Sequence, residues 1–424
     1  MKYMILIGDG MADYIIPSLN KTPLQAATTK NLDRISKEGR VGLCTTVPEH
    51  MPPGSDVANL SIMGYDPILY YTGRGPLEAA SMGVSLKDGD IAFRCNLITT
   101  SDDNDDNGAE IIADFSAGHI SSAEAAQLIE TLETQLSTDN IHFYAGISYR
   151  HLLVIGNCGA EDAICTPPHD VVGQPVSEYC PKNDGEGDNT NDNDRANDNG
   201  GLLNSLMTRS KKILKNHEVN RRRIEAGKKQ ATTIWPWAQG RAPVMPTLNE
   251  LYGCTSAVIC GVDLIKGIGV YAGMDVIKVP GATGYLDTDY SAKARSAIEA
   301  LKTHDLVVVH VEAPDEAGHE GNLIAKIHAI EQFDELVVGA ILKALPDFGE
   351  YTIAVLPDHP TPISIKTHTS DPVPFAIYST NDGSDDVETF DEIAAQKGSL
   401  GIMQGHEILP YMLRLGTKKR NLNN

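Results

Sequence analysis

The sequence predicts an α/β protein in which a doubly wound sheet domain is interrupted by a second, α+β domain. Near both ends of the chain, short apolar runs typical of strands buried on both faces alternate with helix-like stretches. In the middle, strand-like segments follow one another with frequent turn signals. The 424 residues suffice for two or three domains. We therefore expect a discontinuous domain at 1–87 and 246–424 around an inserted domain at 88–245.

Composition argues against several classes of function. A formal charge of −22 argues against nucleic acid as a partner. No apolar run reaches about 18 residues, so we expect no membrane-spanning helix, and the first apolar run is too short for a signal peptide. The seven cysteines are scattered without a Cys-x-x-Cys pair, which is typical of reduced thiols. We expect a cytoplasmic protein.

The N-terminal segment is predicted to open the sheet domain. Residues 3–7 form an apolar run, and Asp9 follows in a Gly-Asp-Gly turn at its carboxyl end. A single amphipathic helix is expected over 22–40, because Thr22 can cap it and Pro23 occupies its first position. A strand, a turn and a helix in this order begin a doubly wound sheet.

The stretch from 45 to 78 is rich in Pro and Gly, and long ordered loops of this kind are usually functional. Pro52-Pro53-Gly54 places Ser55 directly before a helix-like stretch at 56–63. Backbone N–H groups at such a helix start could hold a phosphate beside the serine. The alternative is a plain N-cap serine followed by an acidic first turn, and the local sequence alone favours this alternative.

Further elements follow from periodicity and caps. In the inserted domain we expect a strand at 91–100, a helix from a capping box at 121–124 to residue 136, a strand hairpin over 141–156 and a helix over 202–215. After residue 246 we expect strands at 256–260, 275–279, 306–311, 352–356 and 374–378, and helices at 291–301 and 322–345. The polar tract at 101–108 is expected to be a hairpin tip, and the tract at 183–201 a disordered loop.

Carboxylates and imidazoles lie at or just beyond the predicted strand ends of the sheet domain. They are Asp9, Asp315, His319, Asp358, His359 and His368. Asp315 and His319 share one helix face at positions i and i+4, so both can reach one ion. Any single aspartate could instead be a helix cap or a turn residue. Because strand carboxyl ends converge in an open α/β sheet, we expect one common site.

Three carboxylates and three imidazoles suffice for two divalent ions such as Mn²⁺, Zn²⁺ or Mg²⁺. Glu312 and Glu316 are further candidate ligands. His310 is expected to be a core histidine with satisfied hydrogen bonds. Arg221-Arg222-Arg223 is expected to be a solvated face. Two ions beside Ser55 indicate phosphoryl transfer. Such a site also needs side chains that hold the substrate. The candidates are Arg94, Arg150, His151, His169, Asp170 and Arg241 of the inserted domain and Lys266 of the sheet domain.

Nine sequence blocks carry a resemblance to a known family. They are PPGSDVANLSIMGYDP, YYTGRGPLEAA, GDIAFRCN, YRHLLV, WPWAQGRAP, VDLIKGIG, VPGATGYLDTDY, HVEAPDEAGH and LPDHPTPISIKTHTSDPVPF. In this order they resemble the archaeal-type cofactor-independent phosphoglycerate mutases of the alkaline phosphatase superfamily. The resemblance runs from Ile5 to about Tyr378 and is interrupted mainly by the acidic tracts at 101–108 and 183–201.

The resemblance implies an alkaline-phosphatase-like α/β/α sandwich with two metal ions, Mn²⁺ first and Zn²⁺, Mg²⁺ or Co²⁺ as alternatives. By similarity, Ser55 becomes phosphoserine, and the inserted domain closes over a small phosphorylated substrate. One ion would be held by Asp9, Ser55, Asp358 and His359, and the other by Asp315, His319 and His368. The implied reaction interconverts 3-phosphoglycerate and 2-phosphoglycerate without bisphosphoglycerate.

Asn59 departs from the archaeal pattern, which commonly has His at this position. Asn59 and the block WPWAQGRAP are similar to a bacterial branch for which a homoserine kinase role has been proposed. The same site could relay phosphate from ATP to homoserine, or water could resolve the phosphoserine as in a phosphatase. The sequence leaves these alternatives open, together with the physiological metal and the oligomeric state.

Overall fold

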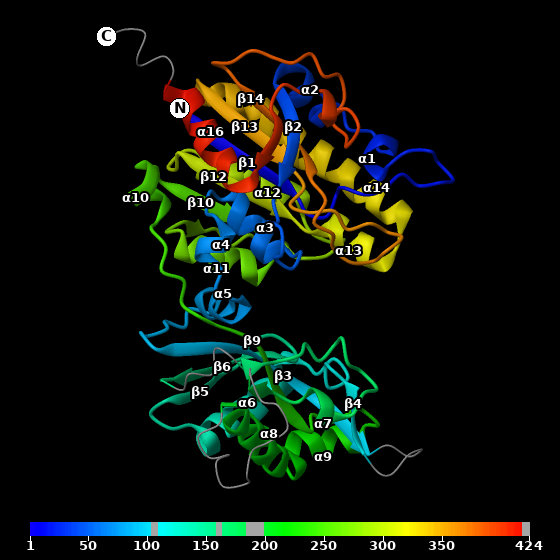
Figure 1. The fold of residues 1–424 in the computed structure, drawn as a ribbon, viewed down its shortest axis with the longest axis vertical. Coiled ribbons are helices and arrows are strands. Elements are labelled where there is room, and N and C mark those ends of the chain that lie inside the picture. The colour runs from blue at the N-terminus through cyan, green and yellow to red at the C-terminus, as the bar shows by residue number, and fades with distance from the viewer. Residues whose placement is uncertain (103–108, 158–162, 184–198, 418–424) are drawn as a thin grey trace. The chain divides into compact units, whose positions relative to one another are not determined.

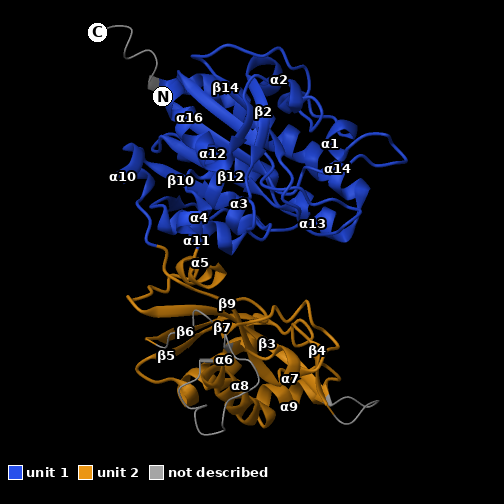
Figure 2. Cartoon of the chain, in the orientation of Figure 1, with its two compact units in different colours: residues 1–71, 244–424 blue, residues 72–243 orange. Residues whose placement is uncertain are grey.

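The computed structural model describes residues 1–102, 109–157, 163–183 and 199–417. It forms two compact units, which we call unit 1 (Met1–Tyr71 with Val244–Asn424) and unit 2 (Thr72–Pro243; Figure 2). The first boundary thus precedes helix α5 (Arg74–Ser81), whereas we expected it at residue 87. Close backbone packing explains the difference, because a Cβ on Gly75 would lie 2.1 Å from the backbone oxygen of Ala92 in unit 2.

Unit 1 is built on an eight-stranded sheet (Figure 1). Its strands in spatial order are β11 (Asp275–Val276), β10 (Ser256–Ile259), β12 (Leu306–Val311), β1 (Lys2–Gly8), β13 (Tyr351–Leu356), β14 (Val373–Ser379), β2 (Arg40–Thr45) and β15 (Gly401–Gln404). The first five strands are parallel, and β14 is antiparallel to both of its neighbours. The α/β class is therefore confirmed, with an antiparallel strand that the sequence pattern did not predict.

The register of the central strands brings their carboxyl ends together. Ile7 of β1 lies opposite His310 of β12 on one side and Leu356 of β13 on the other. All six residues of β12 and of β13 are buried, as the continuous apolar runs predicted. The segments that follow β1, β12 and β13 therefore leave the sheet side by side.

Helices cover both faces of this sheet (Figure 1). They are α1 (Pro23–Ala26), α2 (Lys30–Glu38), α3 (Ser55–Ile62), α4 (Pro67–Tyr70), α10 (Leu248–Tyr252), α11 (Asp263–Tyr271), α12 (Tyr290–Ala300), α13 (Ala313–Glu320), α14 (Leu323–Gln332), α15 (Gly339–Ala344) and α16 (Gly405–Thr417). Side chains of α1, α2, α12, α14 and α15 share one hydrophobic core with Met4 and Leu6 of β1. Helix α16 packs on β13 and α3, and α11 packs on β10 and α3.

The helix expected over 22–40 is two helices, α1 and α2. Thr22 caps α1 in a capping box with Gln25, as predicted, but Ala27 adopts an extended conformation and ends it. Helix α2 starts separately because Asp334, distant in sequence, accepts hydrogen bonds from the backbone N–H groups of Asn31 and Leu32.

The helix expected over 322–345 is also modified. It is α14, a π-helical segment η3 (Phe333–Val338) and α15 in succession. Asp334 lies in η3, so this segment presents the carboxylate that caps α2. The strand expected at 275–279 is shorter than predicted, because only Asp275–Val276 pairs as β11.

Unit 2 is an antiparallel sheet with helices on both faces. Its strands are β3 (Asp90–Asp102), β4 (Glu110–Asp114), β5 (Ile141–Tyr144), β6 (Arg150–Gly156) and β9 (Thr233–Arg241), with a separate pair β7 (Ala163–Ile164) and β8 (Lys182–Asn183). Its helices are α5, α6 (Ser122–Leu136), α7 (Val176–Tyr179), α8 (Asn199–Lys215) and α9 (Glu218–Glu225). Strand β3 pairs with β4, β6 and β9.

Most of the elements predicted for this unit are present. The capping box of Ser121 and Glu124 opens α6, and β5 pairs with β6 as the expected hairpin. Helix α8 begins at Asn199, so the last residues of the tract 183–201 are helical. The rest of that tract (184–198) and the tip 103–108 lie outside the described residues. Within the described part of the chain, no helix is long and apolar enough to cross a bilayer.

Candidate active site

Ser55 is the first helical residue of α3, and Gly54 is the N-cap, without a side chain to cap the helix. The interpretation of Ser55 as a plain N-cap serine is therefore wrong. Its Oγ lies 3.1 Å from Nε2 of His359. Serine at this position has the free N–H groups of the first helical turn beside it, which favours an anion on the hydroxyl.

Asp358 and His359 follow β13 and are fully buried. Oδ1 of Asp358 accepts hydrogen bonds from the backbone N–H groups of Gly10 (3.1 Å) and His359 (2.9 Å). Oδ2 accepts from Nδ2 of Asn59 (2.8 Å), which also donates to the backbone oxygen of Ser55 (2.8 Å). Asn59 thus links the backbone of Ser55 to a predicted ligand.

Asp315 and His319 of α13 and His368 of the loop after β13 form a second group. Oδ2 of Asp315 lies 3.2 Å from Nε2 of His319, and Oδ1 lies 3.4 Å from Nε2 of His368. The two Nε2 atoms are 2.9 Å apart. Each Nδ1 faces a backbone oxygen, that of Lys366 at 3.1 Å for His319 and that of Pro53 at 3.4 Å for His368.

These contacts fit divalent metal ions. In the neutral rings, each Nδ1 donates its proton to a backbone oxygen and each Nε2 carries a lone pair that faces the other ring and Asp315, where a cation would be held. Without a cation, a proton on Nε2 makes the hydrogen bond to Asp315 instead. Asp9 is fully buried, and neither of its carboxylate oxygens has a hydrogen-bond partner. Three groups place their ligand atoms within 4.8 Å of one another: Asp315, His319 and His368; Asp9, His310 and Asp358; and Asp9, Asp315 and His359.

The electrostatics support the same conclusion. Burial and the neighbouring Asp358 and Asp315 carboxylates raise the pKa of Asp9 well above its ordinary value. Burial also disfavours the charged form of Asp315, yet hydrogen bonds with His319 and His368 hold its pKa well below the usual range. Several carboxylates that repel one another in a dry site require positive charge nearby, which a divalent ion supplies.

His310 differs from the expectation of a satisfied core histidine. It is fully buried, but neither ring nitrogen has a hydrogen-bond partner, and Nε2 lies 3.2 Å from Oδ2 of Asp9. The sequence signal was a single imidazole inside the otherwise apolar strand β12, next to the strand that ends at Asp9. His310 therefore belongs to the site.

Metal affinity should depend on pH through His319. The hydrogen bond with Asp315 raises the pKa of His319 to about 9. In the metal-free protein, this contribution to stability is complete below about pH 6.5 and is lost as the pH rises through 9. The ring must lose its proton to bind metal, so the apparent affinity for Mn²⁺ should rise about tenfold per pH unit between pH 7 and 9. Anaerobic calorimetric titrations at pH 7, 8 and 9 measure this, and equal affinities would contradict it.

A separate cationic cluster lies in unit 2 around Arg94. Its Nε lies 2.9 Å from Oε1 of Glu78, and its guanidinium stacks 4.4 Å from the ring of Trp237. Burial lowers the pKa of Arg94, the carboxylate of Glu78 opposes this shift, and the positive charges of Arg74 and Arg150 lower the pKa further. Such a cluster is suited to an anion. Arg74 was not among the predicted residues, although it lies in the block YYTGRGPLEAA.

The other predicted residues of this unit differ in their surroundings. His169 packs edge-on against Trp237 at 5.2 Å, and its Nε2 is 3.6 Å from Oδ1 of Asp170. His151 is 1% exposed, and burial lowers its pKa to about 3, so it is a buried neutral residue next to Arg150 in β6. Arg241 is exposed at the end of β9.

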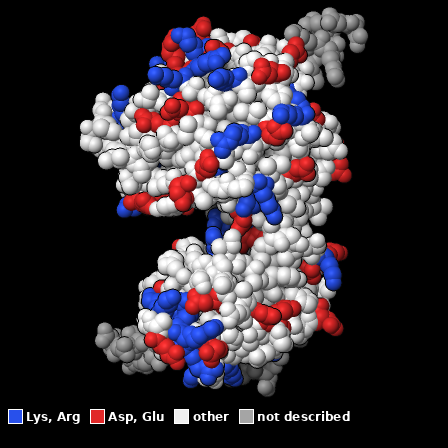
Figure 3. Space-filling view, turned by 180° about the vertical axis from the view of Figure 1, so that it is seen from behind, with Lys and Arg blue, Asp and Glu red and all other residues white. Residues whose placement is uncertain are grey.

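Two further basic regions do not belong to this cluster. Lys266 is in unit 1, where Nζ lies 2.9 Å from Asp263. The run Arg221-Arg222-Arg223 is in α9, and Arg223 is 2% exposed and ion-paired with Glu124 at 2.8 Å, so the expectation of a solvated face is wrong for it. Figure 3 shows Lys and Arg side chains gathered on the surface of unit 2, with Asp and Glu among them.

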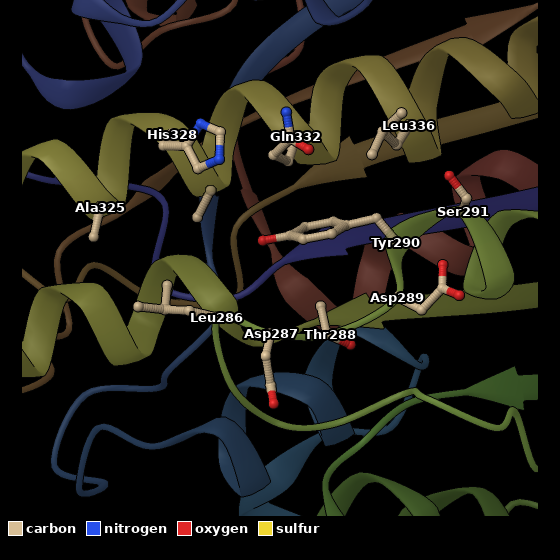
Figure 4. A pocket seen from close by; sticks show the side chains of 11 residues that line it. Leu286, Asp287, Thr288, Asp289, Tyr290, Ser291, Ala325, His328, Gln332 and Leu336 are labelled. Atoms are coloured by element: carbon tan, nitrogen blue, oxygen red, sulfur yellow. The ribbon is translucent and has the colours of Figure 1, made fainter.

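A pocket of about 320 Å³ in unit 1 lies away from the ligand groups. Figure 4 shows Tyr290 at the start of α12 facing His328 and Gln332 of α14 across it. None of the predicted site residues lines this pocket. The candidate active site is therefore identified by its ligand chemistry and not by cavity size.

Comparison with known proteins identifies the family. The family model for 2,3-bisphosphoglycerate-independent phosphoglycerate mutase matches residues 36–220. A protein of this name from Methanosarcina mazei is 55% identical over 418 residues, which are 98% of this chain and 100% of the relative. The chain belongs to this family. A second member, from Methanothermobacter thermautotrophicus, is 51% identical over 97% of both chains. The mutase names of these relatives do not favour the homoserine kinase alternative.

Solved structures agree with this family assignment. A protein from Pyrococcus horikoshii has a TM-score of 0.80 at 30% identity, covering 98% of this chain and 97% of its own. The cofactor-independent phosphoglycerate mutase from Thermoplasma acidophilum has a TM-score of 0.66 at 28% identity, covering 98% and 100%. The similarity to this mutase extends over both units.

Proposed function

We propose that this mutase-family protein interconverts 3-phosphoglycerate and 2-phosphoglycerate through a phosphoserine at Ser55. The observation that carries the proposal is the 3.1 Å contact between Ser55 Oγ and His359 Nε2, beside buried groups suited to divalent metal ions. Family membership supports the substrate, because relatives that align over nearly the whole chain are named for this mutase.

Ser55 would act as the nucleophile. Its Oγ forms a bond to phosphorus of 3-phosphoglycerate while the bond from phosphorus to the 3-oxygen breaks, and the proton lost from Ser55 reappears on the 3-hydroxyl. The 2-hydroxyl of the retained glycerate then attacks the phosphoserine, and a proton returns to Ser55. No water and no second phosphorylated molecule is consumed. The N–H groups of the first turn of α3 stabilise charge on the phosphoryl oxygens.

We propose two Mn²⁺ ions as the resident metals. Asp9, Ser55, Asp358 and His359 would hold one, with His310 beside Asp9, and Asp315, His319 and His368 would hold the other. When bound, the ions would lower the pKa of the serine hydroxyl and neutralise phosphoryl charge. Oxygen and nitrogen donors also accept Zn²⁺, Mg²⁺ or Co²⁺.

Unit 2 would bind the carboxylate of the substrate. Arg94, with Arg150 and Arg74 nearby, offers the planar donor pairs that match a carboxylate. His169 beside Trp237 would contact the glycerate hydroxyl. We keep Asp170, Arg241 and Lys266 as proposed substrate residues. His151 would support the neighbouring Arg150 from below, because it is almost completely buried.

Replacement of Arg94 should weaken substrate binding. In Arg94→Gln the guanidinium that stacks on Trp237 is lost, and kcat/KM should fall about 10- to 100-fold, mainly through KM. Steady-state kinetics with 3-phosphoglycerate measures this. Arg222→Gln is the control, because Arg222 donates a hydrogen bond to Gln127 at the surface. A kcat/KM of Arg94→Gln equal to that of the control would contradict the assignment.

One experiment separates the mutase from its alternatives. Mn²⁺-loaded protein is divided between 3-phosphoglycerate with enolase-coupled detection and homoserine with ATP. We expect turnover in the first assay only. Formation of phosphohomoserine without mutase turnover would identify the protein as a homoserine kinase. Release of inorganic phosphate faster than isomerisation would identify it as a phosphatase.

We further propose that the protein acts in the cytoplasm on small phosphorylated substrates, without nucleic acid or membrane as a partner. The described cysteines Cys44, Cys95, Cys165, Cys180, Cys254 and Cys260 are free thiols, which supports a reducing compartment. The charge of −22 opposes binding to nucleic acid.

A further inference from the structure

Thr361 lies between the two proposed metal-ligand groups. It follows His359 by two residues and is fully buried. Its hydroxyl donates a hydrogen bond to Oδ1 of Asp315, and its Oγ1 lies 3.2 Å from Nδ1 of His359. Asp315 and His359 belong to different proposed ions. The hydroxyl of Thr361 therefore contacts one ligand of each proposed ion.

The direction of both hydrogen bonds follows from the number of protons. The carboxylate of Asp315 can only accept, so the single hydroxyl proton of Thr361 is used there. Nδ1 of His359 must then donate to Thr361. This fixes the tautomer in which Nε2 of His359 presents its lone pair towards Ser55 Oγ, 3.1 Å away.

A buried ammonium fixes the backbone of Thr361. Lys326 of α14 is fully buried, and Nζ donates to the backbone oxygen of Thr361 at 2.8 Å, to Oδ2 of Asp13 at 2.8 Å and to the backbone oxygen of Ala12 at 3.3 Å. All three of its protons are used. Lys326 thus joins the segment after β1, the segment after β13 and α14, each of which adjoins predicted ligands.

Two glycines make room for Thr361. A Cβ on Gly10 would lie 2.6 Å from Oγ1 of Thr361, and a Cβ on Gly318 would lie 2.5 Å from its backbone oxygen. Gly10 also has a positive φ of 62°, which other residues rarely adopt. Asp9 precedes Gly10, and His319 follows Gly318. Gly10 and Gly318, each next to a predicted ligand, therefore leave the space that Thr361 occupies.

We propose that Thr361 is a positioning residue that couples the two metal-ligand groups, by orienting Asp315 in one and fixing the tautomer of His359 in the other. This inference rests on the proposed metal sites. It predicts that removal of one hydroxyl, which is not itself a ligand, weakens both ions together.

Thr361→Val tests the proposal because it keeps the shape of the side chain and removes the hydroxyl. Calorimetric titration with Mn²⁺ should show both dissociation constants raised about 10- to 100-fold, as for loss of other groups that orient metal ligands. Thr361→Ser should restore both to near the wild-type values. Thr352→Val is the control, because Thr352 is equally buried but donates to Ser379 at 2.9 Å in the sheet. Its metal affinities should equal those of the wild type.

Three outcomes would overturn the inference: unchanged affinities in Thr361→Val, loss at one ion only, or failure of Thr361→Ser to restore binding. Thermal unfolding of each chelated variant shows whether it folds. Should Thr361→Val not fold, Thr361→Ala removes the same hydroxyl and should show the same double loss. Wild-type protein that binds no Mn²⁺ would contradict the proposed function itself, whereas two ions in the wild type and in Thr361→Val alike would refute only the role of Thr361.

Discussion

Ser55→Ala should lower kcat with 3-phosphoglycerate by about 10⁴-fold or more, because removal of a nucleophile leaves only binding and electrostatic contributions. The variant should remain folded, since Ser55 is only partly buried and Gly54 caps α3. Its KM should change little, because the carboxylate-binding residues of unit 2 are untouched. Coupled kinetics at saturating Mn²⁺ measures both constants.

Ser61→Ala is the matched control for this prediction. Ser61 lies six residues further along α3 and is 1% exposed, so the same atoms are removed from the same helix. Its kcat should stay within about threefold of the wild type, because it is outside the site. Equal turnover of Ser55→Ala and Ser61→Ala would refute the phosphoserine mechanism.

Asp9→Asn should stabilise the metal-free protein and weaken its metal binding. Because neighbouring carboxylates and burial raise the pKa of Asp9, its charge destabilises the metal-free protein increasingly as the pH rises above about 4. Chelated Asp9→Asn should therefore be more stable than the chelated wild type at pH 8. Loss of this proposed ligand should also abolish most of the mutase activity.

Added Mn²⁺ should reverse the order of stability, so that the wild type becomes more stable than Asp9→Asn. At a free Mn²⁺ concentration 100 times the dissociation constant, each ion stabilises the wild type by about 2.7 kcal/mol. Asp9→Asn should lose most of the gain from the ion that Asp9 would hold, which thermal unfolding with and without Mn²⁺ measures. Asp334→Asn is the control, because Asp334 is a buried aspartate that caps α2 away from the proposed ligands, and its metal gain should stay intact. An equal metal gain in Asp9→Asn and the wild type would contradict the proposed ligands.

The sequence predicted the parts of the site that depend on local pattern. Continuous apolar runs identified β12 and β13, and strand ends converge in every open α/β sheet. This general geometry predicted that Asp9, Asp315 and Asp358 lie close together. The helical spacing of Asp315 and His319 was likewise a local property, and both residues lie in α13.

Features that depend on distant contacts were not predicted. The break between α1 and α2 follows from Asp334, about 300 residues away in the chain. His310 resembled a core residue because its two carboxylate neighbours follow other strands. Thr361 resembled a loop residue, since its hydroxyl partner Asp315 lies on α13. Local sequence does not identify which distant residues such side chains contact.

The most direct test of the central claim is a ³¹P NMR time course of Mn²⁺-loaded protein with 3-phosphoglycerate and no added bisphosphoglycerate. We expect the 2-phosphoglycerate signal to grow to a constant ratio with the substrate while total organic phosphate stays constant. Ser55→Ala under the same conditions should produce no 2-phosphoglycerate signal. Accumulation of inorganic phosphate without 2-phosphoglycerate, or isomerisation that survives Ser55→Ala, would contradict phosphoryl transfer through Ser55.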